Sequence, residues 1–281
     1  MGVCRISFLC LLLFGLGAGV RAEELRFAPL PMESREVVEA QFRPMVEDIS
    51  HAVGIPITMV YVADYEELLN QFRLGRIDLA YLGPLPYIEL RATFPEAEPL
   101  VIFREASGEP FYTCALVSML DEVPRLSGLQ GRRVALTQPL STCGFVVTEV
   151  LLRRHSSSLA QNQFLYAGTH SGALMAVVQG SAHLAGVKTA IAQKFLKLGL
   201  KIREDSEPLP GFVLVANGLS VSAQIRQALV QFLEQADLMA RQGQLAWGEK
   251  VGFGAVVAKD SDFDVVRRLK EEIKVIPWEG Q

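Results

Sequence analysis

The sequence predicts an α/β protein of two lobes, each a mostly parallel β-sheet flanked by helices. Strand and helix patterns alternate from residue 24 onward, and a second series of similar units starts near residue 105. A strand pattern at 212–217 and two further helices then return the chain toward the first series. We therefore expect lobe I at 24–104 plus 214–281 and lobe II at 105–213, joined by two crossing strands.

The first lobe begins with strands and helices in βαβαβ order. The expected elements lie at 24–30, 35–53, 56–62, 64–75, 77–83 and 84–93. The first helix ends at Gly54, and the second opens with Asp64, followed three residues later by Glu67 as in a capping box. The third begins at Pro84, because proline suits the first turn of a helix.

The second series has the same alternation. Two strands are expected at 99–106 and 110–119, separated by a "SGEP" turn. Further strands are expected at 131–138, 162–168, 182–190 and 200–206, with helices at 144–154, 171–180 and 190–198. After the turn "EPLPG", the strand at 212–217 precedes a long helix at 222–241 and a terminal helix at 260–275.

The N-terminus has the features of a cleaved secretory signal peptide. Arg5 precedes about 15 apolar residues, too few for the roughly 20 of a spanning helix, and cleavage is expected after Ala22. We therefore expect a soluble periplasmic protein with residues 1–22 removed. Cys4 and Cys10 would be lost with this peptide.

Composition and charge exclude several function classes. The formal net charge is -4 and no basic cluster accompanies it, which argues against nucleic-acid binding. No His, Asp, Glu or Cys cluster has metal-ligand spacing, so we expect neither a metal nor a cofactor. We expect a monomer that binds a small molecule.

The stretch "QPLSTCGFVVTEVLL" contains the strongest candidate for a ligand site. Ser141, Thr142, Cys143 and Gly144 stand where a loop becomes a helix, so hydroxyls, free amides and the positive helix end coincide. Such a group can hold an oxyanion, or it can simply cap its own helix. His170 occupies the same place in the next strand–helix unit, as a ligand contact or as a structural hydrogen-bonding residue.

The chain resembles the phosphonate-binding type of periplasmic solute-binding proteins of ABC importers, which are related to phosphate and phosphite binders. The resemblance spans "LRFAPLP" to the helix near residue 240 and is carried by "GRIDLAYLGPLPYIEL", "FYTCALV", "LQGRRVALTQPLSTCG" and "GTHSGALMAVVQGSAHLAGV". It implies a two-lobed periplasmic-binding-protein fold of type II and a non-enzymatic receptor. The residues that it implies around the oxyanion are Tyr112, Ser141, Thr142, Cys143, Gly144 and His170, with Tyr81 and Tyr87 added from the first lobe.

The departures from the family pattern bear on the ligand. Aminoalkylphosphonate binders of this family place acidic side chains at the ligand ammonium, but here the corresponding stretches contain His183, Lys188 and Phe212. Because a buried cation without a partner is costly, a zwitterionic aminophosphonate is disfavoured. Phosphate, phosphite and simple phosphonates carry no ammonium group and are favoured.

Two cysteines remain near the expected site, and their role has two interpretations. Cys114 and Cys143 form a disulfide closing a loop of about 29 residues, or they bind a soft ligand as thiols. The second option resembles the arsenite-sensing branch of the family and implies a sensor that signals to a membrane histidine kinase instead of an ABC permease. Two further alternatives stay open: an enzyme with Cys143 as nucleophile and His170 as base, and a purely structural envelope protein.

Overall fold

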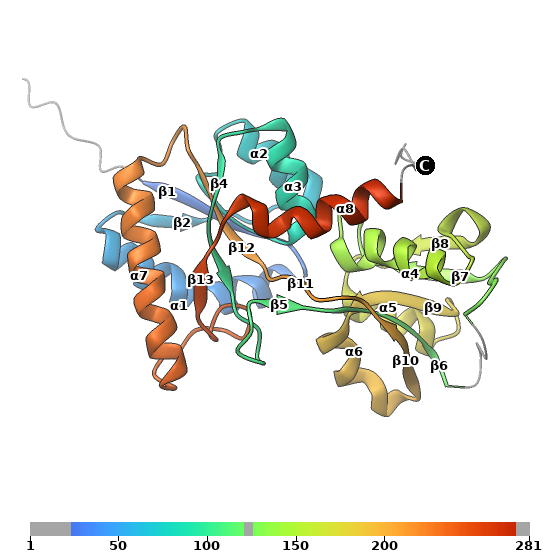
Figure 1. Ribbon diagram of the computed structural model, residues 1–281. Coiled ribbons are helices and arrows are strands. Elements are labelled where there is room, and N and C mark those ends of the chain that lie inside the picture. Colours follow the sequence, from blue (N-terminus) through green and yellow to red (C-terminus); the bar gives the residue numbers. More distant parts are fainter. Residues whose placement is uncertain (1–23, 121–125, 274–281) are drawn as a thin grey trace, which may run out of the picture.

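The computed structural model describes residues 24–120 and 126–273, which form two lobes side by side (Figure 1). The larger lobe is built on a six-stranded sheet with the strand order β13-β4-β12-β3-β1-β2, and the smaller on a five-stranded sheet with the order β10-β6-β9-β7-β8. The predicted signal peptide lies outside the described residues. Within the described ranges, no helix is both long and apolar enough to cross a membrane.

Lobe I contains the six-stranded sheet and the helices that cover it. Its elements are β1 (Leu25–Pro29), α1 (Arg35–Val53), β2 (Ile57–Met59), α2 (Tyr65–Arg73), β3 (Leu79–Leu82), α3 (Pro84–Thr93), β4 (Ala97–Phe103), β12 (Val213–Asn217), α7 (Ala223–Arg241) and β13 (Ala255–Val257). The helix boundaries follow their local signals. Gly54 ends α1 in the left-handed conformation, and the Asp64 side chain accepts from the Glu67 N–H at the start of α2.

Lobe II contains the five-stranded sheet. Its strands and helices are β6 (Cys114–Met119), β7 (Arg133–Leu136), η1 (Thr142–Val147), α4 (Thr148–Arg154), η2 (Leu159–Gln161), β8 (Gln163–Tyr166), α5 (His170–Val178), β9 (Leu184–Lys188), α6 (Thr189–Phe195), η3 (Leu196–Leu198) and β10 (Leu200–Asp205). The helix expected at 144–154 begins earlier than predicted. Its first turn, η1, is π-helical, and α4 continues it.

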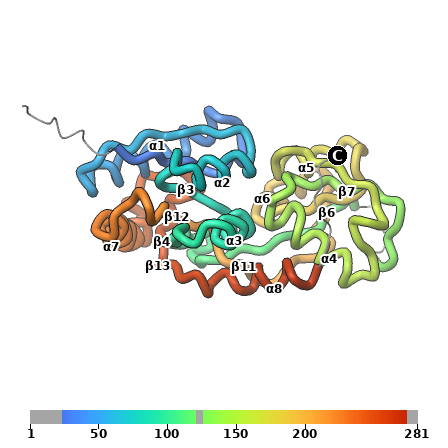
Figure 2. Tube along the Cα trace, turned by 90° about the horizontal axis from the view of Figure 1, so that it is seen from above, coloured from blue at the N-terminus to red at the C-terminus, as the bar shows by residue number. Residues whose placement is uncertain are grey.

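Both sheets mix parallel and antiparallel pairs in the same way. The strands of the early strand–helix units are parallel, as β2, β1 and β3 are in lobe I and β8, β7 and β9 in lobe II. The strands that enter or leave by the connection between the lobes, β12 and β6, pair antiparallel with their neighbours. Figure 2 shows the two lobes apart, and residues at the carboxyl ends of parallel strands from both lobes line one cavity between them: Leu30 after β1, Gly83 after β3 and Lys188 at the end of β9.

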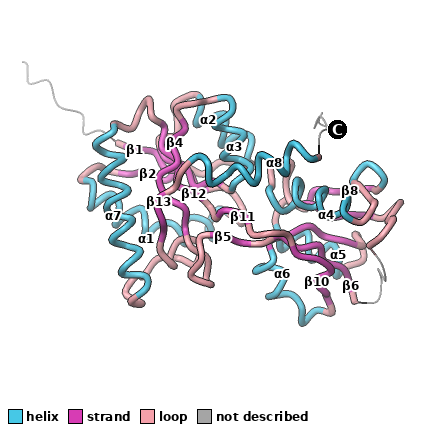
Figure 3. Tube along the Cα trace, in the orientation of Figure 1, coloured by secondary structure: helices cyan, strands magenta, loops and turns pink. Residues whose placement is uncertain are grey.

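Two short strands connect the lobes. They are β5 (Phe111–Tyr112) and β11 (Leu209–Pro210), which pair antiparallel and run side by side from one lobe to the other (Figure 3). The terminal segment η4 (Asp260–Phe263) and α8 (Asp264–Glu272) also bridges the lobes, because α8 contacts both α3 and η1. The core of lobe I lies between α1, α7 and the sheet, with residues such as Phe27 and Phe42 fully buried.

Candidate functional site

A small cavity lies between the lobes, where the N-termini of three helices meet. Gly83 caps α3, Ser141 caps η1, and His170 opens α5. The cavity is lined by Leu30, Tyr65, Gly83, Pro86, Tyr112, Ser141, Thr142, Cys143, His170, Lys188 and Phe212. Its volume of about 10 Å³ has room for about one water molecule. The two lobes are therefore closed on each other in this structure.

The loop at Ser141 acts both as a helix cap and as a wall of the cavity. Ser141 Oγ accepts from the Gly144 N–H at 3.0 Å, which leaves the Ser141 O–H free to donate. Gly144 does not line the cavity, and its amide serves Ser141 in place of the expected ligand. A Cβ at Gly144 would lie 2.0 Å from Thr137 Oγ1, so close packing explains this glycine.

Thr142 links this loop to the opposite lobe. Its Oγ1 accepts from the backbone N–H of Leu85, in the first turn of α3, at 3.0 Å. The Thr142 and Tyr112 side chains line the same cavity. The Leu85 amide of lobe I thus points toward the hydroxyl groups of lobe II. A ligand oxygen placed between the lobes would accept hydrogen bonds from both lobes.

His170 is a neutral donor at this cavity. Its Nδ1 accepts from the Lys188 N–H at 3.3 Å, so the proton of the neutral ring resides on Nε2. Burial, with smaller contributions from the charges of Lys188 and Lys250, lowers the pKa of His170 to about 3. The imidazole therefore stays uncharged at neutral pH and offers an N–H without a titrating charge.

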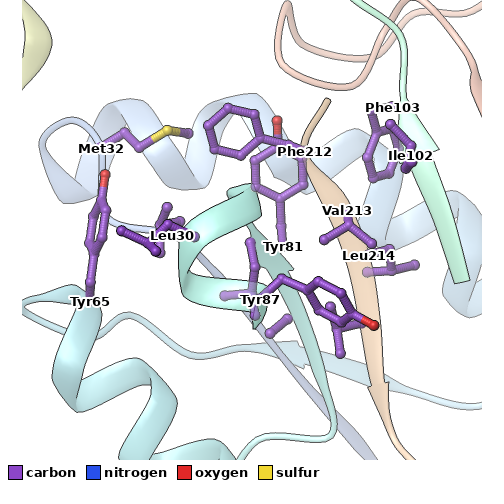
Figure 4. Packing of buried hydrophobic residues seen from close by; sticks show 14 of the residues in the cluster. Leu30, Met32, Tyr65, Tyr81, Tyr87, Ile102, Phe103, Phe212, Val213 and Leu214 are labelled. Atoms are coloured by element: carbon purple, nitrogen blue, oxygen red, sulfur yellow. The ribbon is translucent and has the colours of Figure 1, made fainter. Parts of the chain in front are cut away.

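The two tyrosines predicted from lobe I are not brought to this cavity. The Tyr87 hydroxyl donates to Asp260 Oδ1 at 2.7 Å, and its ring packs on Phe263, on the side of α3 away from Tyr65 (Figure 4). Tyr87 therefore does not line this cavity, because its position in α3 faces the segment that leads into α8. Tyr81 stacks on Phe212 at 5.1 Å and donates to the Lys250 carbonyl, and it lines a larger chamber beside the small cavity.

The cysteines are joined in a disulfide between Cys114, at the start of β6, and Cys143, in η1. Their Cα atoms are 5.1 Å apart, and Cys143 lines the cavity. The disulfide interpretation therefore holds in this structure. Neither sulfur is available as a thiolate ligand or a nucleophile while the bond is intact.

A larger chamber of about 510 Å³ lies beside the small cavity and is lined by residues of both lobes. Tyr112 and Lys188 line both spaces, so they form the partition between them. The Lys188 ammonium lies 2.7 Å from Glu105 Oε1 and over the rings of Tyr112 and Phe212, at 4.9 and 5.3 Å from their centroids. Burial lowers the pKa of Lys188, and the Glu105 carboxylate acts in the opposite direction.

Polar contacts across the cleft hold the lobes together. The Gln138 amide of lobe II contacts the Pro31 carbonyl and the Tyr65 N–H of lobe I, at 3.3 and 3.4 Å. Lys194 and Glu249 form an ion pair at the rim, where both side chains are more than half exposed. Among the described residues there is no group of His, Cys, Asp or Glu that could hold a metal ion.

Sequence reasoning missed the wall that lobe I contributes. Leu30, Tyr65, Gly83, Pro86 and Leu85 come from loops and helix starts whose apolar or backbone character carries no chemical signal. The position of these residues in loops that follow strands is the one sequence signal for them, because the parallel strands of a sheet end at a common edge. The partnership of Lys188 with Glu105 joins residues 83 positions apart and is not visible in the sequence.

Two characterised proteins are similar to this chain in sequence. The chain is similar to the phosphate-import protein PhnD of Mycolicibacterium smegmatis, with 23% identity over 272 residues, covering 88% of this chain and 85% of that protein. It is 25% identical over 207 residues to the phosphonates-binding periplasmic protein of Escherichia coli, of which the match covers 60%.

Solved structures confirm the fold. A PhnD1 structure from Prochlorococcus marinus in complex with methylphosphonate has a TM-score of 0.76 at 16% identity, covering 91% of this chain and all (100%) of that one. A binding component of an ABC phosphonate transporter from Pseudomonas aeruginosa has a TM-score of 0.74 at 18% identity, with 90% and 87% coverage. The two-lobed periplasmic-binding-protein fold is therefore confirmed.

The family model described as ABC transporter, phosphonate, periplasmic substrate-binding protein matches residues 27–263. This range contains both sheets, except for the first strand residues, and every residue that lines the small cavity. The chain therefore belongs to the family of periplasmic phosphonate-type substrate-binding proteins of ABC transporters.

Proposed function

We propose that this protein captures a small oxyanion, such as phosphate, phosphite or a simple phosphonate, in the cavity between its lobes and presents it to an ABC permease. The observation that carries the proposal is the meeting of four neutral donor side chains at one buried point. These donors are Tyr112, Ser141, Thr142 and His170. The first turn of α3 adds the backbone amide of Leu85 from the other lobe.

Neutral donors and helix N-termini suit an oxyanion that must be released again. Hydrogen bonds to a charged group contribute roughly 1.5 to 3 kcal/mol each, and a helix N-terminus favours negative charge without a full countercharge. Inorganic phosphate and methylphosphonate present three or four acceptor oxygens on one centre. A set of converging donors matches that arrangement.

The size of the closed cavity favours small ligands. Since about 10 Å³ holds about one water molecule, an oxyanion enters only when the lobes separate slightly. The Thr142 hydroxyl now accepts the α3 amide that an oxyanion oxygen would take over. Opening and closing about β5 and β11 is consistent with the two crossing strands, since hinges are few and short.

The arsenite-sensor alternative required free thiols. With Cys114 and Cys143 bonded to each other, the soft ligands that this alternative depends on are missing under oxidising conditions. The disulfide therefore favours a hard oxyanion. Among the relatives, one is named a phosphate-import protein and another a phosphonates-binding protein, which supports export to the periplasm and an ABC permease as partner.

Calorimetric titration of the mature protein tests the proposal. The ligand panel consists of phosphate, phosphite, methylphosphonate, arsenate and arsenite. We expect saturable one-to-one binding of at least one phosphorus oxyanion by a monomer and no binding of arsenite by the oxidised protein. Absence of binding by every phosphorus oxyanion would refute the proposed function, and tight arsenite binding would restore the sensor alternative.

A further inference from the structure

Lys188 fills a cage that is built to hold an ammonium group. One carboxylate, that of Glu105, lies 2.7 Å from Nζ, and the rings of Tyr112 and Phe212 lie within 4.9 and 5.3 Å of it. A carboxylate together with aromatic faces is the usual arrangement by which proteins bind ammonium ions. Here the ion is supplied by the protein itself.

The cage is buried and adjoins the oxyanion cavity. Only 12% of the Lys188 side chain and 21% of the Glu105 side chain are exposed. Lys188 and Tyr112 line both the small cavity and the outer chamber, so the ammonium lies at the partition between them. Among the described residues that line the small cavity there is no Asp or Glu. Glu105, Glu109 and Glu249 line the outer chamber, where Glu105 is paired with Lys188 and Glu249 with Lys194.

We propose that Lys188 is a specificity-determining residue: its ammonium occupies the Glu105, Tyr112 and Phe212 cage, and thereby excludes ligands that carry their own ammonium beside the oxyanion. The inference rests on the proposed function, because it assumes an oxyanion in the adjoining cavity. A zwitterionic aminoalkylphosphonate would place its cation against the Lys188 cation, and no carboxylate stands among the described residues that line the small cavity to receive it. An alkylphosphonate of the same length meets no such repulsion.

The same arrangement predicts what happens when the lysine side chain is removed. Lys188→Ala leaves the Glu105 carboxylate and two aromatic faces open toward the oxyanion cavity. A tethered ammonium can then take the vacated place. Lys188→Met fills the space with an uncharged chain of similar length, so it removes the repulsion without opening the cage.

The experiment compares ethylphosphonate with 2-aminoethylphosphonate by calorimetry. We expect the wild-type protein to prefer ethylphosphonate by at least about tenfold. For Lys188→Ala we expect the affinity for 2-aminoethylphosphonate to rise by at least about tenfold, and for Lys188→Met we expect a smaller gain or none. The double variant Glu105→Gln/Lys188→Ala should not show this gain in affinity for 2-aminoethylphosphonate, because it lacks the carboxylate that would receive the ammonium group. Lys201→Ala, which removes an exposed lysine of β10 away from both cavities, is the matched control and should leave both affinities unchanged.

The possible results separate this inference from the proposed function. If the wild-type protein binds neither phosphonate nor phosphate, the proposed function fails and the inference fails with it. If the wild-type protein binds ethylphosphonate but Lys188→Ala gains no affinity for the amine, the inference alone is overturned. If thermal unfolding shows that Lys188→Ala is not folded, the inference is tested by the preference of the wild-type protein for ethylphosphonate over 2-aminoethylphosphonate. Equal or tighter binding of 2-aminoethylphosphonate would then overturn the inference.

Discussion

The two lobes contribute different chemistry to the same cavity. Lobe II brings hydroxyls and an imidazole from Ser141, Thr142 and His170, whereas lobe I brings mainly the apolar surfaces of Leu30 and Pro86. Donors on one lobe can hold an oxyanion before closure, and an apolar wall from the other then excludes water and strengthens those hydrogen bonds. The difference suggests that lobe II recognises the ligand and lobe I closes over it.

Removing the disulfide is the largest expected perturbation, because it releases the donor loop of lobe II. Replacing both cysteines, Cys114→Ser and Cys143→Ser together, should lower the free energy of unfolding by about 2 to 4 kcal/mol. Urea unfolding of the variant and of the oxidised wild type measures this. Native wild-type protein should expose no reactive thiol until a reductant is added. A thiol that reacts in the untreated protein would contradict the disulfide.

Thr142→Val should have the largest effect on binding. The variant removes a cavity-lining hydroxyl that accepts from the α3 amide, and the loss of a hydrogen bond to a charged ligand weakens binding by about tenfold or more. Thr93→Val, at the exposed far end of α3, is the matched control. An unchanged dissociation constant for Thr142→Val would reduce this loop to a helix cap.

His170 should make the protein less stable in acid. Its pKa is lowered to about 3 in the folded protein, while the ordinary value for histidine is 6.5, so between these values the unfolded chain binds a proton that the native state does not. Stability therefore falls as the pH falls through this window, by up to about 1.4 kcal/mol per pH unit. Unfolding measured from pH 4 to 7 should show a shallower dependence for His170→Gln than for the exposed-site control His51→Gln. Identical slopes would contradict the buried neutral imidazole.

Tyr65→Phe should have the smallest effect and so sharpens the comparison of the lobes. The residue lines the cavity from lobe I and is buried, but its ring contributes mainly to the wall. We expect the affinity for the oxyanion to change by about threefold or less, as for a hydroxyl that is not essential. Calorimetric dissociation constants of Tyr65→Phe and Thr142→Val, measured side by side, show which variant loses more affinity. A loss as large as that of Thr142→Val would show that lobe I shares in recognition.

Local signals predicted the helices well, and the reasons are visible in the structure. Gly54, Asp64 and Pro84 each act within one turn, so the boundaries of α1, α2 and α3 depend on neighbours in the sequence. The predicted strand series also places the ends of the parallel neighbours β7 and β8 at one edge of the lobe II sheet. That is why Ser141, Thr142 and His170 could be assigned to one cavity before the structure was known.

Features that depend on distant partners could not be predicted. The strand β13 is three residues long and follows a glycine-rich stretch, and β11 includes Pro210, which is unusual in strands. Both are stabilised by pairing with β4 and β5, far away in the sequence. Tyr87 was a first-lobe candidate beside the residues that the family resemblance implies, and the sequence does not show that its hydroxyl pairs with Asp260 far along the chain.

The central claim is that lobe II donors hold an oxyanion in the cavity between the lobes, and a crystal structure of the complex with methylphosphonate tests it most directly. We predict phosphonate oxygens within hydrogen-bonding distance of the Ser141 and Thr142 hydroxyls and of His170 Nε2, with an α3 amide completing the site from lobe I. A ligand bound elsewhere, or held only by residues of lobe I, would contradict the account.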